Sequence, residues 1–159
     1  MKRPLGVSVL AVCAVLVALL YVVRIGLDVV GADMDLLVFS LAGSAVFAVL
    51  FLLVGLGFMA GQAWSWMLAL LLIGWYVALR VFDFLVSMLD GGLSFGWLIA
   101  MTSGVLVVIA VGAIIGFYLA RERVQRYFNV RLRGEAIVGI VAAAAVVAVV
   151  MRGVPYLSI

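Results

Sequence analysis

Charged residues that interrupt long apolar runs are the first candidates for chemistry in this sequence. Arg24 and Asp28 are four residues apart, and Arg80 and Asp83 are three residues apart, so each pair shares one helix face. Both pairs fall near the same end of their predicted helices and could form one polar cluster with three further carboxylates: Asp33, Asp35 and Asp90. Such a cluster could admit a small ion or a polar ligand. The alternative is structural: paired side chains anchor helices at a membrane surface, because pairing lowers the desolvation cost.

Residue types that carry most enzymatic chemistry are scarce. The chain has no histidine, its one cysteine is Cys13, and its one lysine is Lys2. Histidine-based catalysis, bis-histidine haem, a disulfide within the chain, a thiol redox pair and a catalytic lysine inside a membrane helix are therefore excluded. We expect no enzyme activity, no catalytic residue, no metal site and no cofactor.

The composition predicts an integral membrane protein. Of the 159 residues, 70% are hydrophobic and 11% are charged, against roughly 45–50% and 25% in soluble domains. A soluble fold of this size could not hide so much apolar surface, since it buries only about 70% of its chain. The net charge of +3 is not a nucleic-acid signature, and we expect no nucleic-acid partner.

The apolar runs predict an all-α fold, a polytopic membrane helix bundle with four transmembrane helices and a shorter fifth. The uncharged run 36–79 would be about 66 Å long as one helix, twice the hydrocarbon thickness. It must therefore fold back, and Gly61-Gln62-Ala63 is the expected turn. The predicted spans are 5–29, 36–60, 64–89, 95–120 and 136–154, with Pro155 expected to end the last helix.

Arginines set the expected orientation and segment boundaries. Lys2 and Arg3 precede the first span, and five arginines follow the fourth, so both groups face the same side. The positive-inside rule places that side in the cytoplasm, with the N-terminus, and the protein in the cytoplasmic membrane. The predicted domains are the four-helix bundle 1–120, a basic cytoplasmic segment 121–135, and the fifth helix with its tail, 136–159.

The segment 121–135 is predicted to be an amphipathic helix on the inner leaflet. Val124, Tyr127, Phe128 and Leu132 fall on one helical face. The five arginines, which would contact lipid headgroups, occupy much of the rest: Arg121, Arg123, Arg126, Arg131 and Arg133. The alternative is a positively charged anchor that only links two spans.

Small residues at regular spacing predict helix-packing seams. They are Gly112, Gly116 and Ala120 in the fourth span, Gly139 and Ala143 in the fifth, and Ala14 and Ala18 in the first. The seams serve either packing within this chain or contact with another subunit. Deeper in the third span, Trp75 and Tyr76 could line a lipid or quinone groove, with ordinary helix packing as the alternative.

Three short stretches together resemble a group of small prokaryotic four-helix membrane proteins of unknown function. They are Arg3-Pro4-Leu5-Gly6-Val7, Gly55-Leu56-Gly57 with Trp64-Ser65-Trp66, and Tyr118-Leu119-Ala120-Arg121 with Val124, Arg126 and Phe128. The resemblance covers residues 3–130, and the group usually has a basic residue where this chain has Gln62-Ala63. The resemblance supports the topology and implies no catalytic residues.

The expected function is that of a non-catalytic structural or accessory subunit of a larger membrane complex, for example an energy-transducing one. Its partners would be membrane lipids and other membrane subunits. The alternative is a small homo-oligomeric channel or transporter that uses the Arg/Asp cluster. A third hypothesis is a lipid- or quinone-binding module around Trp75 and Tyr76.

Overall fold

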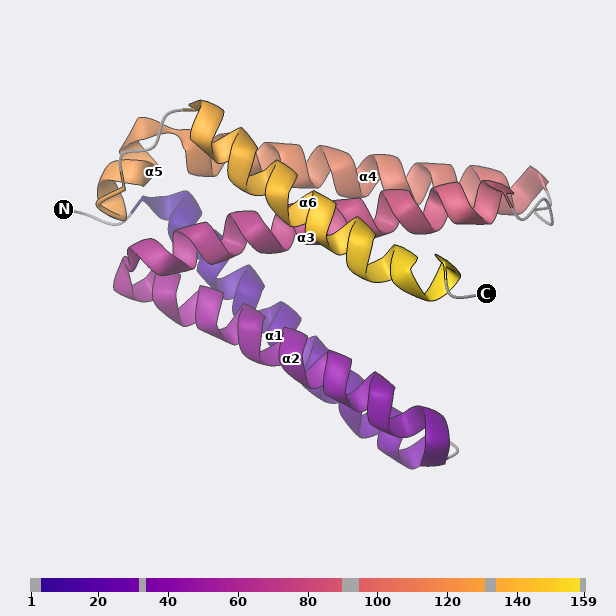
Figure 1. Cartoon of the computed structure of the whole chain (residues 1–159). Helices are drawn as coiled ribbons and strands as arrows, with labels where there is room; N and C mark the ends of the chain where they lie inside the picture. The colour runs from indigo at the N-terminus through magenta and orange to yellow at the C-terminus, as the bar shows by residue number, and fades with distance from the viewer. Residues whose placement is uncertain (1–3, 32–33, 90–94, 131–133, 158–159) are drawn as a thin grey trace. The chain divides into compact units, whose positions relative to one another are not determined.

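The computed structural model describes the backbone of residues 4–31, 34–89, 95–130 and 134–157, without the side chains of 28, 30–31, 34–42, 95–101 and 152–157. These residues form helices and no strand, which confirms the all-α fold class (Figure 1). The helices are α1 (Leu5–Gly31), α2 (Met34–Ala60), α3 (Ala63–Leu89), α4 (Phe95–Ala120), α5 (Glu122–Tyr127) and α6 (Gly134–Leu157).

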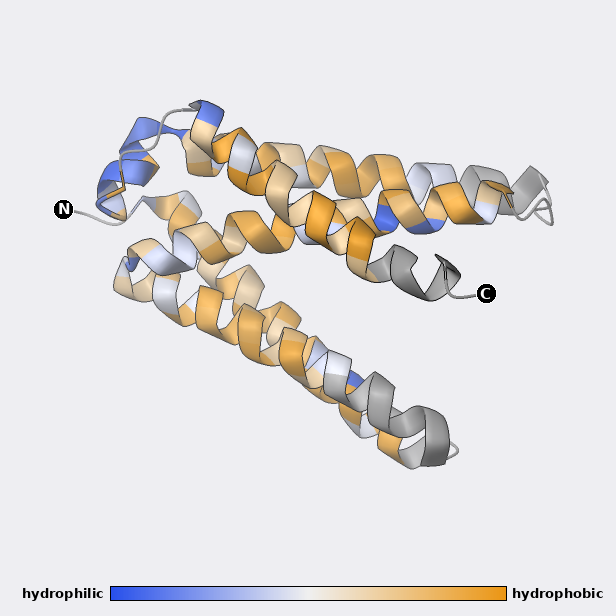
Figure 2. Ribbon diagram, in the orientation of Figure 1, coloured by the Kyte–Doolittle hydropathy of each residue, from blue (hydrophilic) through white to orange (hydrophobic). Residues whose placement is uncertain are grey.

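Five of these helices are long and apolar enough to cross a membrane, as Figure 2 shows by their hydrophobic colouring. Their apolar stretches are Leu5–Leu27, Gly43–Ala60, Ala63–Leu89, Thr102–Leu119 and Gly134–Met151. No more than 33% of the residues in any of the five windows are buried, so most side chains face outward, as lipid-surrounded helices require. The chain is therefore a multi-pass membrane protein.

The fifth helix, α6, is longer than the sequence suggested. It begins at Gly134 and continues to Leu157, past Pro155, which was expected to end it. Proline removes one N–H, and in the last turn that costs a single backbone hydrogen bond, so the helix can continue for two residues.

The chain folds into two compact units, which are described separately. Unit 1 is formed by the described residues of Met1–Met67 and Arg126–Val130, and unit 2 by those of Leu68–Gln125 and Arg131–Ile159. The division cuts through α3 and through α5, whose last two residues belong, together with 128–130, to the unit of α1 and α2. The predicted domains 1–120, 121–135 and 136–159 stay a prediction.

Unit 1 is built on the α1–α2 hairpin. Ala14 and Ala18, the small residues predicted to form a packing seam in the first span, are buried, and so is Ala11. A Cβ at Gly55 of α2 would lie 2.7 Å from Cγ2 of Val15, so the two helices approach closely there. Further along, aromatic rings fill the space: Tyr21 stacks with Phe47 and Phe51 at 5.7 and 6.0 Å between ring centres.

The turn between α2 and α3 lies at the predicted position. Gly61 has φ +66°, a left-handed conformation that glycine adopts without strain. The Gln62 N–H donates to the Gly57 carbonyl at 2.9 Å and the Gly61 N–H donates to that of Phe58 at 3.4 Å, the two bonds of a Schellman cap. The Ser65 hydroxyl donates to the Gln62 carbonyl at 2.7 Å. This cap ends α2 and starts α3 within two residues.

In unit 2, α3 contacts both α4 and α6. A Cβ at Gly112 of α4 would lie 3.0 Å from Cγ2 of Val77. On the α6 side, a Cβ at Gly74 would lie 2.7 Å from the carbonyl oxygen of Val141. The buried face of α6 consists of Ile137, Ala144 and Ala148. Small residues therefore set both helix contacts of unit 2.

Candidate functional site

Arg80 is the charged residue whose surroundings within a span are best defined. It is exposed on α3, and its Nε and Nη2 donate hydrogen bonds to the Tyr76 hydroxyl oxygen at 3.2 and 3.1 Å. Its Cζ lies 5.3 Å from the centre of the Tyr76 ring, within cation–π range. Tyr76 thus holds the guanidinium along the helix. Sequence reasoning missed this contact, although the four-residue spacing that produces it was visible.

The remaining members of the predicted polar cluster are placed less completely. Asp83 is half-buried one turn after Arg80, and its backbone carbonyl accepts a 2.7 Å hydrogen bond from the Ser87 hydroxyl. Arg24 is exposed on α1, and the side chain of Asp28 lies outside the described residues. Arg24 belongs to unit 1 and Arg80 to unit 2, so the single cluster stays a prediction.

The predicted packing residues have two kinds of environment. Gly112 faces α3 inside unit 2, where Cγ2 atoms of Val77 and Ile73 would lie 3.0 and 3.3 Å from its Cβ. By contrast, nothing lies within 4 Å of the Cβ positions of Gly116 and Gly139.

The alanines of the two predicted seams also differ in their exposure. Ala120 is half-buried after Gly116 in α4, whereas Ala143 is exposed one turn after Gly139 in α6. The seam of α4 is therefore partly used within the chain, while the predicted seam of α6 is open along both of its members.

Trp75 has the one buried side-chain donor without a hydrogen-bond partner in the described part of the chain, its indole Nε1. The neighbouring Tyr76 is 39% exposed and accepts hydrogen bonds from Arg80. Because the indole N–H is enclosed by protein, a lipid or quinone carbonyl could accept from it only after a side chain moves. The groove predicted around these two residues stays a prediction.

The arginine-rich segment is shorter and more firmly held than expected. Its helix, α5, has six residues, Glu122–Tyr127. In the turn that follows, Asn129 has φ +54° and its N–H donates to the Arg126 carbonyl. The side predicted to lie on the leaflet is buried in the protein: Val124 is 2% exposed and Phe128 is 1% exposed. These two apolar side chains therefore pack against the protein rather than against lipid.

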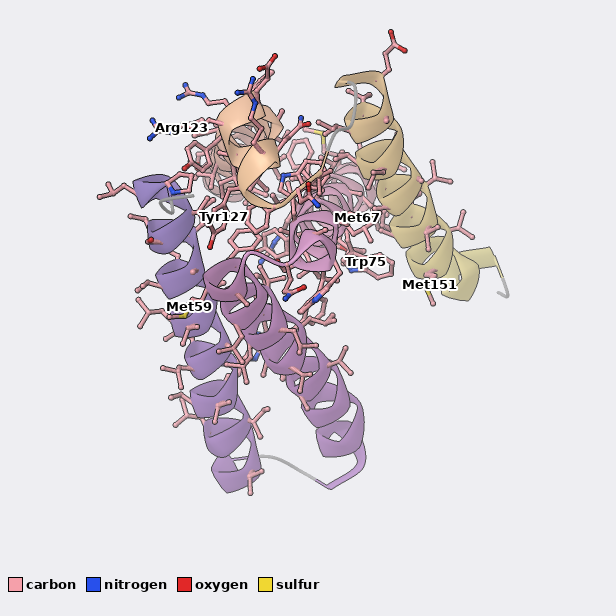
Figure 3. All side chains as sticks on the ribbon, turned by 90° about the vertical axis from the view of Figure 1, so that its left-hand side faces the viewer. Met59, Met67, Trp75, Arg123, Tyr127 and Met151 are labelled. Atoms are coloured by element: carbon pink, nitrogen blue, oxygen red, sulfur yellow. The ribbon has the colours of Figure 1, made fainter. Side chains whose placement is uncertain are left out.

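The arginines of this segment lie on its outer surface. Arg121, Arg123 and Arg126 are exposed, and Figure 3 shows Arg123 pointing away from α5. Arg131 and Arg133 lie outside the described residues. Lipid-headgroup contact by these arginines stays a prediction.

The described charged side chains can bind ions at single charges or contact lipid headgroups, and the described small residues can pack helices together. No group of three or more His, Cys, Asp or Glu within the described ranges is placed to hold a metal ion. The resemblance to small prokaryotic four-helix membrane proteins stays a prediction. Comparison with models of known families, with characterised proteins and with solved structures finds no match for this chain.

Proposed function

We propose that this protein is a non-catalytic structural or accessory subunit of a larger membrane complex, such as an energy-transducing one. The observation that carries the proposal is the second face of α6. One face of this helix is buried against its own unit through Ile137, Ala144 and Ala148. The other face presents Ala136, Gly139 and Ala143, all exposed.

The open face of α6 has the residue pattern of a membrane helix contact. Gly139 and Ala143 are four residues apart, and apart from the adjoining residues and the backbone of α6 itself nothing lies within 4 Å of the Gly139 Cβ position. Small residues at this spacing allow two helix backbones to approach, and close approach is what stabilises helix association inside lipid. A helix of a partner subunit could therefore pack on α6 without displacing any packing of the chain itself.

We also propose the cytoplasmic membrane as the location, with the N-terminus and α5 on the cytoplasmic side. The described arginines near α5, which are Arg121, Arg123 and Arg126, support this orientation, because cytoplasmic loops carry an excess of basic residues.

Replacing Gly139 with leucine tests the accessory-subunit proposal. In mild detergent, the wild-type chain of 17.0 kDa is expected to purify in a larger particle that also contains unrelated proteins in a fixed ratio. Overpacking at a helix contact costs about 1–3 kcal/mol, so Gly139→Leu should weaken retention of those partners about fivefold or more. Co-purification with quantitative mass spectrometry measures this.

Gly104→Leu is the matched control, since Gly104 of α4 also has nothing within 4 Å of its Cβ position. It should retain the partners. A particle made only of this chain, or equal retention in both variants, would contradict the proposal.

The second candidate is a small homo-oligomeric channel or transporter, which the position of Arg80 favours. This cation lies in an apolar span, is exposed, and is oriented by Tyr76. If it selects an ion, Arg80→Gln should reduce flux into reconstituted vesicles about tenfold or more, since one lost charge contact inside a membrane is worth more than ~1.4 kcal/mol. Arg80→Lys, which keeps the positive charge at this position, should leave flux within about threefold. Unchanged flux in Arg80→Gln would exclude this candidate.

A further inference from the structure

The last residue of α5, Tyr127, is fixed against the turn between α2 and α3. The apolar stretch Gly43–Ala60 ends just before Gly61, and the apolar stretch Ala63–Leu89 begins just after Gln62. This turn therefore marks where two spans leave the hydrocarbon. The Tyr127 hydroxyl lies 3.4 Å from the carbonyl oxygen of Phe58 and 3.5 Å from that of Met59, and it donates to both. A Cβ at Gly61 would lie 3.2 Å from the Tyr127 ring. Tyr127 therefore sits at the depth of the headgroups.

The start of α5 is held at the end of a span as well. The apolar stretch of α4 ends at Leu119, and the side-chain amide of Gln125 donates to the Ala120 carbonyl at 3.0 Å. The N–H groups of Val124 and Gln125 both donate to the Arg121 carbonyl, at 2.9 and 3.0 Å. This cap folds the first turn of α5 directly onto the end of α4, so Arg121 and Arg123 also stand at headgroup depth.

The apolar side of this segment is not available to lipid. Phe128 is 1% exposed, and its ring centre lies 5.1 Å from that of Phe58 and 5.0 Å from that of Tyr127. Val124 is 2% exposed. A surface helix that inserts apolar side chains into a leaflet needs that face free. Any attraction between α5 and the membrane must therefore come from its charges.

We propose that Arg121 and Arg123 form a binding surface for the anionic phospholipid headgroups of the adjoining leaflet, and that this surface acts by charge alone. Both arginine side chains are exposed, and Glu122, which lies between them in the sequence, is the one acidic residue of α5. Figure 2 shows α5 as a hydrophilic section between hydrophobic helices. Basic residues next to an anionic leaflet each raise binding about fivefold.

The test titrates phosphatidylglycerol into the purified full chain in an uncharged detergent and measures the midpoint of thermal unfolding by tryptophan fluorescence. A ligand that binds the folded state raises the midpoint, and the dependence on lipid concentration gives the apparent affinity. Phosphatidylglycerol should raise the midpoint and phosphatidylcholine should not. The variant Arg121→Gln/Arg123→Gln should lose about 30-fold in affinity for phosphatidylglycerol.

The matched control is Arg121→Lys/Arg123→Lys, which keeps both charges and should keep the affinity within about threefold. At 1 M salt, where the Debye length is about 3 Å, the difference between the two lipids should disappear. Wild-type affinity in the glutamine variant would overturn the proposal. So would a difference between the two lipids that persists at 1 M salt, because it would indicate recognition of the headgroup by something other than charge. An equal loss in the lysine variant would replace the charged surface with a geometrically specific arginine site. Inorganic phosphate that raises the midpoint as phosphatidylglycerol does, beyond a chloride control, would show a free-anion site instead.

Discussion

Phe128→Ala is expected to lower the free energy of unfolding of unit 1 by about 3–5 kcal/mol, the usual cost of removing a buried aromatic ring. The ring is 1% exposed and packs on Phe58, itself 2% exposed. Its loss leaves a cavity at the α2–α3 turn, where the Gly61 cap cannot shift without breaking two hydrogen bonds. Unfolding by an anionic detergent in mixed micelles, followed through the fluorescence of the fully buried Trp66 of the same unit, measures the change.

Phe117→Ala is the matched control for this prediction. The same ring is removed from α4, but Phe117 is 77% exposed, so it meets lipid or detergent rather than protein. Its loss should change the free energy of unfolding by about 0.5 kcal/mol or less. If the two variants were equally destabilised, the segment 126–130 would not be packed in unit 1 as described.

Gly74→Leu should have the second largest effect, a loss of about 1–3 kcal/mol from unit 2 together with displacement of α6. A Cβ at this position would lie 2.7 Å from the carbonyl oxygen of Val141 and 3.3 Å from the Cβ of Ala144. A backbone oxygen cannot rotate away as a side chain can, so the whole helix has to move. Detergent-induced unfolding measures the energy, and thiol labelling measures the displacement.

The labelling experiment uses Ala148→Cys in a background where Cys13 is replaced by alanine. Ala148 is 0% exposed on the inner face of α6, so the introduced thiol should react slowly with a membrane-permeant maleimide. Adding Gly74→Leu should make it reactive, and adding Gly104→Leu, which meets no atom within 4 Å, should not. A thiol that stays protected in the Gly74→Leu background would mean that α6 does not depend on this contact.

The long helices could be predicted from the sequence because each depends on a local property. An uninterrupted apolar run forms a helix in lipid, since its backbone groups have no other hydrogen-bond partners. The predicted span 95–120 coincides with α4. The turn at Gly61 was equally predictable, because a glycine between two apolar runs can take the left-handed conformation that ends a helix.

The packing of these helices could not be predicted in the same way. Gly112 and Gly116 are one turn apart and look equivalent in sequence, yet only Gly112 touches α3. Four residues advance the helix by more than one full turn of 3.6 residues, so the stripe drifts around the axis. Which glycine meets a neighbour then depends on the crossing angle, and that angle is set by side chains far apart in the sequence.

The candidate site was predicted in its residue types and only partly in its contacts. Arg80 was paired by spacing with Asp83, and that pairing stays a prediction. Its hydrogen bonds to Tyr76 were overlooked, although an aromatic hydroxyl one turn earlier also reaches the guanidinium. The sequence pattern placed Val124 of α5 and Phe128, which follows it, on one apolar face, and both side chains are buried. The sequence alone could not show whether they would face lipid or protein, since both are apolar surroundings.

The Phe58–Phe128 contact also sets an order on biosynthesis. The α1–α2 hairpin leaves the ribosome early, but Phe58 lies 69 residues before the tyrosine that caps its turn. At about 5–20 residues per second, the ribosome needs roughly 4–14 s to reach Tyr127 and Phe128. Throughout that interval the end of α2 has to be covered by lipid, by the insertion machinery or by a chaperone, so α2 acquires its full packing only after α3, α4 and α5 have been synthesised.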